Sequence, residues 1–293
     1  MEYIPAKTII TKNKSTAWFG TDYTMNIYRG CNHGCIYCDS RSDCYHNFDF
    51  DTVKAKENAL EIIRNELRRK VRSGIIATGS MSDPYNPFEK QLELTRHGLE
   101  LISAYGLGVA VATKSPLITR DADILKEISE HSPVIVKLTI TTPDDELSRI
   151  IEPHVAVSSQ RLGALSALSC AGVYAGVLLM PVLPWITDNE QAIITLLDMI
   201  KAAGGRFVYG AFGMTMRDGQ REYFYDRLDE SFPGMKEKYQ KAFSGRYQCS
   251  SPKAQKLYYS FENHCNKIGL LYKMKDIVFD YKKGYGDTQL KFF

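Results

Sequence analysis

Short apolar segments rich in β-branched residues alternate along the chain with segments whose apolar residues recur every three to four positions. The first kind of segment predicts buried strands, and the second predicts amphipathic helices. Six strands are expected, beginning near Tyr23, Ile75, Gly108, Val134, Val173 and Arg206. Their spacing is about that of one strand–helix unit. Such alternation is typical of an α/β fold with a parallel sheet.

The clearest predicted helix lies before the second strand. Asp51 is expected to cap its amino end, and basic residues between positions 68 and 72 suit its negative carboxyl end before Gly74. Its apolar face consists of Leu60, Ile63, Leu67 and Val71. Further helices are predicted over residues 91–104, 122–130, 160–171 and 189–203.

Six strand–helix units fit two architectures, an open doubly wound sheet and a curved, partly closed barrel. Periodicity alone does not separate them. In both architectures the functional groups lie in loops that follow the carboxyl ends of the strands. The loops with the most distinctive residues are 29–38, 78–89, 113–115, 139–142 and 180–188.

The composition is that of an ordinary globular protein. Of 293 residues, 44% are hydrophobic and 24% are charged, which excludes a disordered or collagen-like chain. The net charge of +3 is too small to indicate a nucleic-acid-binding protein by itself. Residues 234–293, however, hold 12 Lys and Arg against 5 Asp and Glu, together with 7 Tyr and 5 Phe. Such residues bind phosphates and stack on unpaired bases, although surface lysines beside core tyrosines give the same composition.

One uncharged segment, residues 162–187, is long enough to span a bilayer. Gly172 and Gly176 interrupt it, and Pro181 and Pro184 would break a helix. A short helix, a buried strand and a loop are the better interpretation. Since the amino end also lacks the apolar core of a secretory signal, we expect a cytoplasmic protein without a membrane segment.

The cysteines give the strongest chemical signal. Three of the seven form a C-x3-C-x2-C motif: Cys31, Cys35 and Cys38. Clustered thiols in a reducing compartment indicate a soft metal. Zinc in a structural site takes four ligands, of which His33, Cys44 or His46 would have to supply the last. An iron–sulfur cube held by three cysteines instead leaves one iron open to bind a reactant.

With its repeated strand–helix units, this motif resembles the radical S-adenosylmethionine (SAM) superfamily. The segments NIYRGCNHGCIYC, SMSDPYNPFE, ATKSPLITRD and MPVLPWITD resemble the spore photoproduct lyase-like branch, which includes a DNA repair enzyme. The resemblance implies an α/β fold, a partial (β/α)6 TIM-type barrel over residues 18–213. Residues 214–293 would form a basic, aromatic-rich extension.

The resemblance also implies the cofactors and the first step of the reaction. Cys31, Cys35 and Cys38 would hold a [4Fe-4S] cluster, and SAM would chelate the open iron. A donor such as flavodoxin or ferredoxin would supply an electron, and reductive cleavage of SAM would give a 5′-deoxyadenosyl radical. The enzyme would be lyase-like, with carbon–carbon bond cleavage as a candidate reaction, and DNA would be its partner.

Several residues match positions that contact SAM in this family. Tyr37 would contact the adenine, Lys114 the SAM carboxylate, and a small-residue turn the amino group. Thr139 and Thr141 would hydrogen-bond the ribose or the carboxylate, although strand threonines are common for other reasons. The turn contains Gly79, Ser80 and Ser82.

Two residues of the segment SMSDPYNPFE are predicted to act on the substrate. Asp83 would be a catalytic carboxylate, and Tyr85 would stack on a base, with ordering of the loop and packing as the alternatives.

One position departs from the repair lyase. That enzyme has a cysteine near the end of its second strand that returns a hydrogen atom to the product radical, and Ser80 stands at the corresponding position here. Because a hydroxyl is a far poorer hydrogen-atom donor, either a tyrosine or another thiol takes this role or the reaction differs. The other candidate thiols are Cys170, Cys249 and Cys265.

The last five residues, from Gln289 to Phe293, read QLKFF and resemble peptides that bind the bacterial sliding clamp. A tail that packs on its own domain is the alternative. Three functions therefore stay open: a radical SAM enzyme acting on DNA, one acting on RNA, a peptide or a small molecule, and a zinc-binding module without catalysis.

Overall fold

The computed structural model describes residues 1–69, 71 and 73–285. Its main sheet has the strand order β10-β9-β8-β7-β6-β3-β2, and every neighbouring pair is parallel except the edge pair β2–β3. The strands are β2 (Ile10–Lys12), β3 (Tyr23–Met25), β6 (Ile75–Thr78), β7 (Gly108–Thr113), β8 (Val134–Thr139), β9 (Ala175–Leu179) and β10 (Val208–Gly210). The six strands predicted from the sequence are therefore confirmed.

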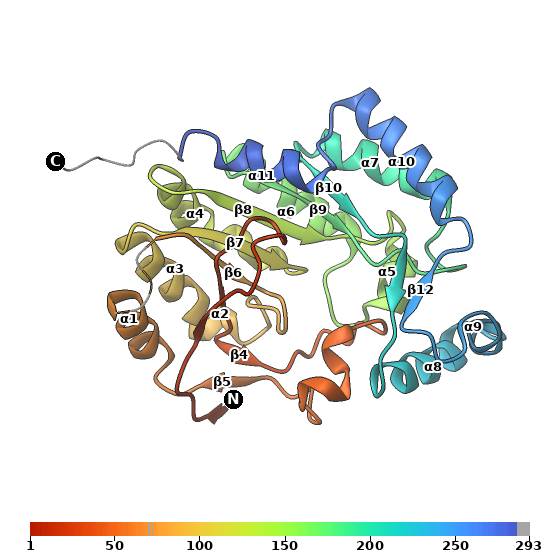
Figure 1. Cartoon of the computed structure of the whole chain (residues 1–293), viewed down its shortest axis with the longest axis horizontal. Helices are drawn as coiled ribbons and strands as arrows, with labels where there is room; N and C mark the ends of the chain where they lie inside the picture. The colour runs from red at the N-terminus through yellow and green to blue at the C-terminus, as the bar shows by residue number, and fades with distance from the viewer. Residues whose placement is uncertain (70, 72, 286–293) are drawn as a thin grey trace.

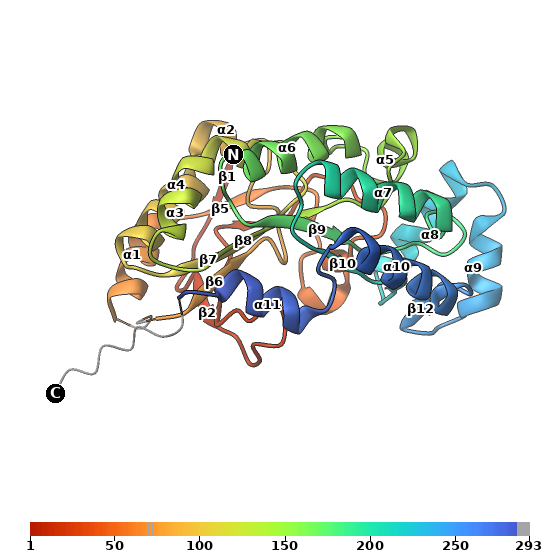
Figure 2. The ribbon, with the colours of Figure 1, turned by 90° about the horizontal axis from the view of Figure 1, so that it is seen from above.

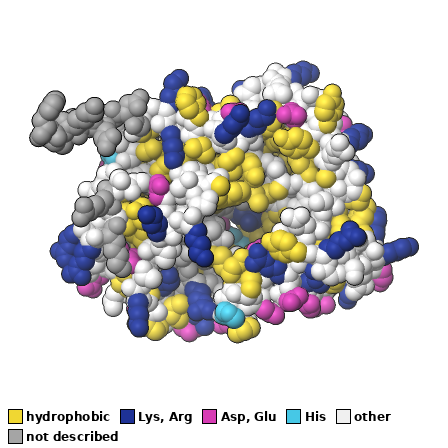
Figure 3. All heavy atoms as spheres, in the orientation of Figure 1, with side chains coloured by type: hydrophobic (Ala, Val, Ile, Leu, Met, Phe, Trp, Pro, Cys, Tyr) yellow, Lys and Arg dark blue, Asp and Glu magenta, His cyan; other side chains and the backbone are white. Residues whose placement is uncertain are grey.

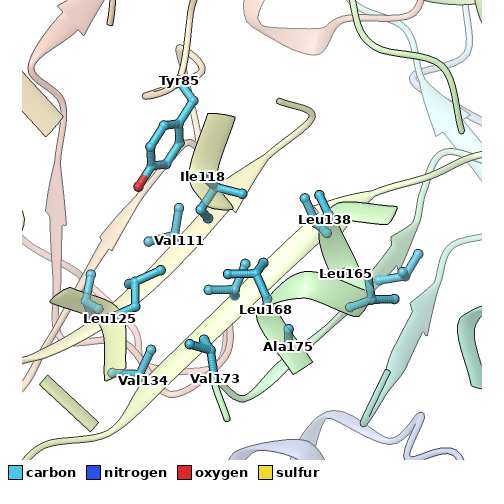
Figure 4. Packing of buried hydrophobic residues seen from close by; sticks show 14 of the residues in the cluster. Tyr85, Val111, Ile118, Leu125, Val134, Leu138, Leu165, Leu168, Val173 and Ala175 are labelled. Atoms are coloured by element: carbon cyan, nitrogen blue, oxygen red, sulfur yellow. The ribbon is translucent and has the colours of Figure 1, made fainter. Parts of the chain in front are cut away.

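Helices cover the convex face of this sheet, which is a partial TIM-type barrel (Figure 1). Val111, Val136 and Leu138 point outward into the largest hydrophobic core, where Leu165 and Leu168 meet them (Figure 4). The helices are α1 (Ala59–Arg69), α2 (Glu89–Leu92), α3 (Leu94–Ala104), α4 (Ala122–Ser129), α5 (Asp145–Ile151), α6 (Ser158–Cys170) and α7 (Glu190–Ala202). Three 3-10 helices lie in the loops, namely η1 (Asp39–Arg41), η2 (Asp43–Tyr45) and η3 (Pro116–Asp121).

The structure corrects two details of the sequence prediction. Asp51 does not cap α1, which begins at Ala59; its carboxylate is paired with Arg41 instead. The helix predicted over residues 91–104 is divided into α2 and α3, because Glu93 adopts a left-handed conformation with φ of 49°. Helix α5 was not predicted, and neither was a small sheet of β1 (Glu2–Ile4), β5 (Lys54–Lys56) and β4 (Tyr28–Arg29).

The carboxyl-terminal part of the chain packs against the barrel (Figure 2). Helix α10 (Ala254–Ile268) packs beside α7, and Ile277 of α11 (Met274–Lys282) packs with Phe19 at one end of the barrel. In the sequence, four elements follow β10 and precede α10. They are α8 (Gln220–Ser231), α9 (Met235–Phe243) and the antiparallel pair β11 (Gly213–Thr215) and β12 (Gln248–Ser250).

The aromatic residues of this carboxyl-terminal part are divided between core and surface. Tyr239 and Phe261 are buried, whereas Tyr259 and Phe279 are 67% and 72% exposed. Packing therefore accounts for only some of the aromatic enrichment. None of the helices in the described residues has the length and apolar character needed to cross a membrane.

Candidate active site

A cavity of about 890 Å³ opens at the carboxyl ends of the parallel strands. Thr78, Thr139 and Leu178 at or near the strand ends line it, and Tyr37 and Cys38 of the cysteine loop form part of its wall. The face of the molecule drawn in Figure 3 is hollowed near its middle, with apolar side chains around the opening. The topology thus brings the loops singled out in the sequence to one site.

The cysteine loop is held by close backbone contacts. Gly30 has φ of +79°, and a Cβ atom there would lie 2.2 Å from the carbonyl oxygen of Thr52, so only glycine fits. The amide of Cys31 donates to the carbonyl of Phe50 over 2.7 Å. Ser82 donates its hydroxyl proton to the Gly30 carbonyl. Ser82, which belongs to the segment SMSDPYNPFE, therefore supports the cysteine loop.

Burial and neighbouring groups shift the pKa of two of these thiols, Cys31 and Cys35. Burial raises the pKa of Cys31 to about 11, with Asp83 and Cys38 adding to the rise. Burial also raises the pKa of Cys35, and Cys38 and Cys31 add to it while Lys114 opposes it. The fold thus favours neutral thiols at Cys31 and Cys35 unless a metal or another positive charge stabilises their thiolates.

The number of thiols matches the donor set of an iron–sulfur cube that keeps one iron open. Zinc binds sulfur at about 2.3 Å, so three thiols on one zinc ion must converge tightly. Within residues 1–69, 71 and 73–285, no group of three His, Cys, Asp or Glu side chains is arranged to hold a metal ion. In an iron–sulfur cube each thiolate binds a different iron, which requires a wider arrangement. Three cysteine thiols in one loop, with Cys38 in the cavity lining, are the donor set that a [4Fe-4S] cluster with one open iron needs.

A buried charge network connects this loop to strand β8. Glu152 is paired with Arg161 and accepts the phenol proton of Tyr37. Arg161 also donates from Nη1 to the carbonyl oxygen of Thr139 over 2.8 Å. Neither Glu152 nor Arg161 was singled out from the sequence, since each lies on or beside a helix and no spacing motif includes it.

Lys114 lies beside the same network. Its ammonium is 5.7 Å from the centre of the Tyr37 ring. Burial lowers the pKa of Lys114, but Cys35, Glu152 and Cys38 together more than offset it, so the pKa is raised. Lys114 therefore supplies a fixed positive charge at the cysteine end of the cavity.

Asp83 serves the loops rather than the open cavity. Its carboxylate accepts hydrogen bonds from the Thr113 hydroxyl at 2.6 Å and the Lys114 amide at 2.8 Å. His33 Nδ1 lies 3.5 Å from the same carboxylate, which ties the cysteine loop to the end of β7. Asp83 is buried and is absent from the cavity lining. In this structure Asp83 therefore holds the Lys114 backbone and the cysteine loop, and its catalytic role stays a prediction.

Comparison with known proteins now identifies the family. Residues 25–197 match the family model of the radical SAM superfamily. The chain is a radical SAM protein. An uncharacterized protein of Mycobacterium tuberculosis is 32% identical over 244 residues, which cover 81% of this chain and 72% of the relative. A radical SAM Nalpha-GlyT isomerase of Pseudomonas phage M6 is 22% identical over 182 residues, which cover 62% of this chain and 37% of the isomerase.

Among solved structures, the fold of this radical SAM protein is similar to that of spore photoproduct lyase. A mutant of that lyase with dinucleoside spore photoproduct has a TM-score of 0.66 and 14% identity, covering 91% of this chain and 78% of the lyase chain. The architecture expected from the resemblance is confirmed.

The residues expected to contact SAM fall into two groups. Gly79, Ser80 and Thr139 line the cavity with Tyr37 and Lys114. Gly79 has φ of +92°, and a Cβ atom there would lie 1.8 Å from the Ala112 carbonyl oxygen. Ser82 and Thr141 do not line the cavity. The Thr141 hydroxyl is buried and has no hydrogen-bond partner among the described residues.

The structure corrects the expectation for Tyr85. Its ring is 1% exposed and packs in the main hydrophobic core near Ile118 and Val111 (Figure 4). The phenol lies beside Asp121, which adds to the effect of burial in raising the pKa of Tyr85. Because no face of the ring is free, Tyr85 cannot stack on a base in this conformation.

The thiols considered as hydrogen-atom donors lie outside the cavity. Cys170 is exposed at the end of α6, and Cys265 is buried in α10. Cys249 lies between two cavity-lining residues of β12, Gln248 and Ser250, but points to the opposite side of the strand. Among the described residues, Cys38 is the only cysteine in the lining. The sliding-clamp motif from Gln289 to Phe293 lies outside the described residues.

Proposed function

We propose that this chain is a radical SAM enzyme in which Cys31, Cys35 and Cys38 hold a [4Fe-4S] cluster and the adjoining cavity binds SAM. The observation that carries the proposal is the junction of the cysteine loop with a cavity at the strand ends. When bound, the cluster and SAM would supply one-electron chemistry and a 5′-deoxyadenosyl radical. The protein would orient SAM and exclude water and oxygen.

The residues of this chain would divide these tasks by their chemistry. Lys114 would attract the SAM carboxylate and balance the negative charge of the thiolates. The close approach at Gly79 leaves backbone groups of the strand end accessible to the SAM amino group. Tyr37, fixed by Glu152, would contact the adenine, and Thr139 would hydrogen-bond the ribose or carboxylate.

The parts of the chain would also divide the work. Residues 18–213 would form the catalytic barrel, and residues 214–293 would support it. Gln220 donates its amide proton to the Tyr37 carbonyl over 3.0 Å, and Phe224 packs in the same core as Cys35. The extension would therefore stabilise the cluster loop as well as contribute to the cavity wall.

DNA is the substrate that we propose. The similar lyase fold binds a dinucleoside spore photoproduct, and exposed basic and aromatic residues near the carboxyl end suit nucleic acid. Ser80 in place of a donor thiol favours a different reaction from that of the lyase, and it keeps a substrate such as RNA, a peptide or a small molecule as the second candidate.

The first experiment tests the cofactor chemistry. The full chain is reconstituted with iron and sulfide without oxygen, reduced with dithionite and incubated with SAM, and 5′-deoxyadenosine is measured. We expect formation by the wild type and by Cys170→Ala, an exposed cysteine outside the cavity, and none by Cys31→Ala. Equal formation by Cys31→Ala and Cys170→Ala would refute the ligand assignment.

The second experiment tests the substrate. The reconstituted enzyme, with flavodoxin or ferredoxin as the reductant, is offered thymine-rich single-stranded DNA, the same DNA after ultraviolet irradiation, and RNA of the same sequence. Mass spectrometry then follows each product. A mass change or deuterium transfer confined to DNA supports the proposal, whereas modification of RNA alone would select the second candidate.

A further inference from the structure

A lysine occupies the interior of the barrel one layer below the proposed SAM site. In β8 the side chains of Ile135, Lys137 and Thr139 point inward, while those of Val136 and Leu138 point outward to the helices. Lys137 is 2% exposed and lines the cavity together with Thr139. Its side chain therefore borders the space that a substrate would enter.

Among the described residues, no carboxylate pairs with the ammonium group of Lys137. Within the described part of the chain Lys137 has neither an ion pair nor a hydrogen bond, and its Nζ lies 4.7 Å from the centre of the Phe19 ring. Burial alone lowers the pKa of Lys137 to about 7. Since burying an unpaired charge is destabilising, the folded protein has no structural use for a charge at this position. An anionic ligand would provide the missing counterion.

Other residues that line the cavity offer groups that suit a nucleotide. Lys14, Ser15 and Trp18 belong to the loop between β2 and β3 and line the same cavity. The Trp18 ring is 42% exposed and meets the Phe19 ring edge to face, with centroids 5.0 Å apart. One part of the indole therefore stays open for a stacking partner.

The loop that carries Trp18 is fixed in place. Asn13 donates from Nδ2 to the carbonyl of Thr21 over 3.0 Å and accepts from the Thr24 hydroxyl over 2.7 Å. These bonds connect the start of the loop to β3, next to the barrel strand β6. The loop that carries Trp18 and the strand that carries Lys137 are thus connected through the hydrogen bonds of the same sheet.

The charges that line the cavity favour an anion. Lys14, Lys114 and Lys137 face it, against one carboxylate, Asp39. Asp39 already accepts a hydrogen bond from Tyr45 at 3.0 Å and lies 3.6 Å from the Arg217 guanidinium. Lys114 adjoins the cysteine loop and is assigned to SAM, so Lys14 and Lys137 are the lysines available to bind the substrate.

We propose that Lys137 binds a backbone phosphate of a single-stranded nucleic-acid substrate, with Trp18 stacking on a base and Lys14 contacting the strand at the entrance. This inference rests on the proposed function and adds a substrate subsite to it. A flat, partly exposed indole beside two lysines suits a base and its phosphate better than the carboxylate of a peptide, which needs no stacking surface.

The test removes the charge from each side of the contact in turn. Binding of the thymidine dinucleotide TpT to the reconstituted full chain with SAM is measured by calorimetry, together with TpT carrying a neutral methylphosphonate linkage. Lys137→Met removes the ammonium, Lys137→Arg keeps a positive charge, and Lys126→Met on the outer surface of α4 is the control.

We expect Lys137→Met to bind TpT about 10- to 100-fold more weakly than the wild type, the range of a hydrogen bond to a charged group. The methylphosphonate should weaken wild-type binding by a similar factor and should have little further effect on Lys137→Met. Lys137→Arg should recover part of the affinity, and Lys126→Met should bind as the wild type does. Wild-type binding at pH 7 should take up protons, because a phosphate favours the charged lysine.

Three results would overturn the inference. The wild type could bind TpT and its neutral analogue equally, or Lys137→Met and Lys126→Met could weaken TpT binding equally. The third result is tighter binding of an acidic peptide than of TpT by the wild type in the same assay. Formation of 5′-deoxyadenosine from SAM without TpT separates the two proposals. If Lys137→Met keeps this activity, the proposed function stands whatever the binding result. If this activity falls and TpT binding does not, Lys137 serves SAM and the subsite is wrong. The wild-type comparison of the two ligands decides the question even if Lys137→Met does not fold.

Discussion

The buried pair of Glu152 and Arg161 gives the sharpest prediction about stability. Both side chains are fully buried, and Arg161 makes three further hydrogen bonds, to the carbonyls of Ala156 and Thr139 and to the Ser148 hydroxyl. Burial lowers the pKa of Arg161, but Glu152 more than offsets it, so the pKa is raised and the guanidinium stays charged. The substitution Arg161→Met would leave the buried Glu152 carboxylate without its ion-pair partner.

We expect Arg161→Met to lower the free energy of unfolding by about 3–5 kcal/mol, the usual cost of removing one partner of a buried pair. The double variant Arg161→Met/Glu152→Leu should recover most of that loss, because no unpaired charge remains. Urea denaturation followed by circular dichroism measures all three proteins and the Glu152→Leu single variant as a double-mutant cycle. A loss below about 1 kcal/mol for Arg161→Met, or losses that simply add in the double variant, would refute this reasoning.

The same variants separate stability from SAM binding. The double variant removes the acceptor of the Tyr37 hydroxyl and the donor to the Thr139 carbonyl, both beside the proposed SAM site. We therefore expect weaker SAM binding even where stability is recovered. Wild-type SAM affinity in the double variant would show that the network acts on stability alone.

Three further substitutions test other parts of the structure. Gly79→Ala should abolish SAM binding or folding, because its Cβ would lie 1.8 Å from a carbonyl oxygen, whereas Gly163→Ala in α6 meets nothing within 4 Å and should be stabilising by up to about 1 kcal/mol; equal thermal stability and SAM affinity of the two variants would contradict this. Tyr85→Leu, which removes the ring, should lower the free energy of unfolding but leave the DNA affinity of the folded protein unchanged, because the ring is in the core; a tenfold loss of DNA affinity at wild-type stability would restore the stacking role. Lys137→Met should be more stable than the wild type at pH 7, because folding lowers the lysine pKa from 10.5 to about 7. At 1.36 kcal/mol per pKa unit, the gain in the free energy of unfolding is at most about 5 kcal/mol. The unfolded chain binds the extra proton, so wild-type stability should rise between pH 7 and 10.5 and the difference should vanish above that range; a constant difference would contradict the assignment.

The strands and the cysteine loop could be predicted because each has a local signal. Apolar runs such as the one from Gly108 to Thr113 form strands wherever they pair, and the three-cysteine spacing is independent of tertiary structure. The end of α3 at Ala104 and the start of α7 at Glu190 followed the expected boundaries closely. Whether a segment forms a helix or a strand could therefore be predicted from the pattern within that segment.

Side-chain direction was less predictable, since it depends on packing between distant segments. Tyr85 follows a proline in a polar loop, yet its ring packs under η3 and not in the cavity. Glu152, Arg161 and Lys137 acquire their roles only when α5, α6 and β8 come together. A lysine within an apolar strand was the one available signal for Lys137, and only the inward direction of its side chain gives it meaning.

Electron paramagnetic resonance of the reduced, anaerobically reconstituted protein tests the proposed cluster most directly. We predict about four iron atoms per chain, a signal from a reduced [4Fe-4S] cluster, and a change in that signal when SAM is added, since SAM would bind the open iron. The Cys38→Ala variant should lose the signal, and Cys170→Ala should keep it. A protein without iron, or a cluster whose signal SAM leaves unchanged, would contradict the proposed function.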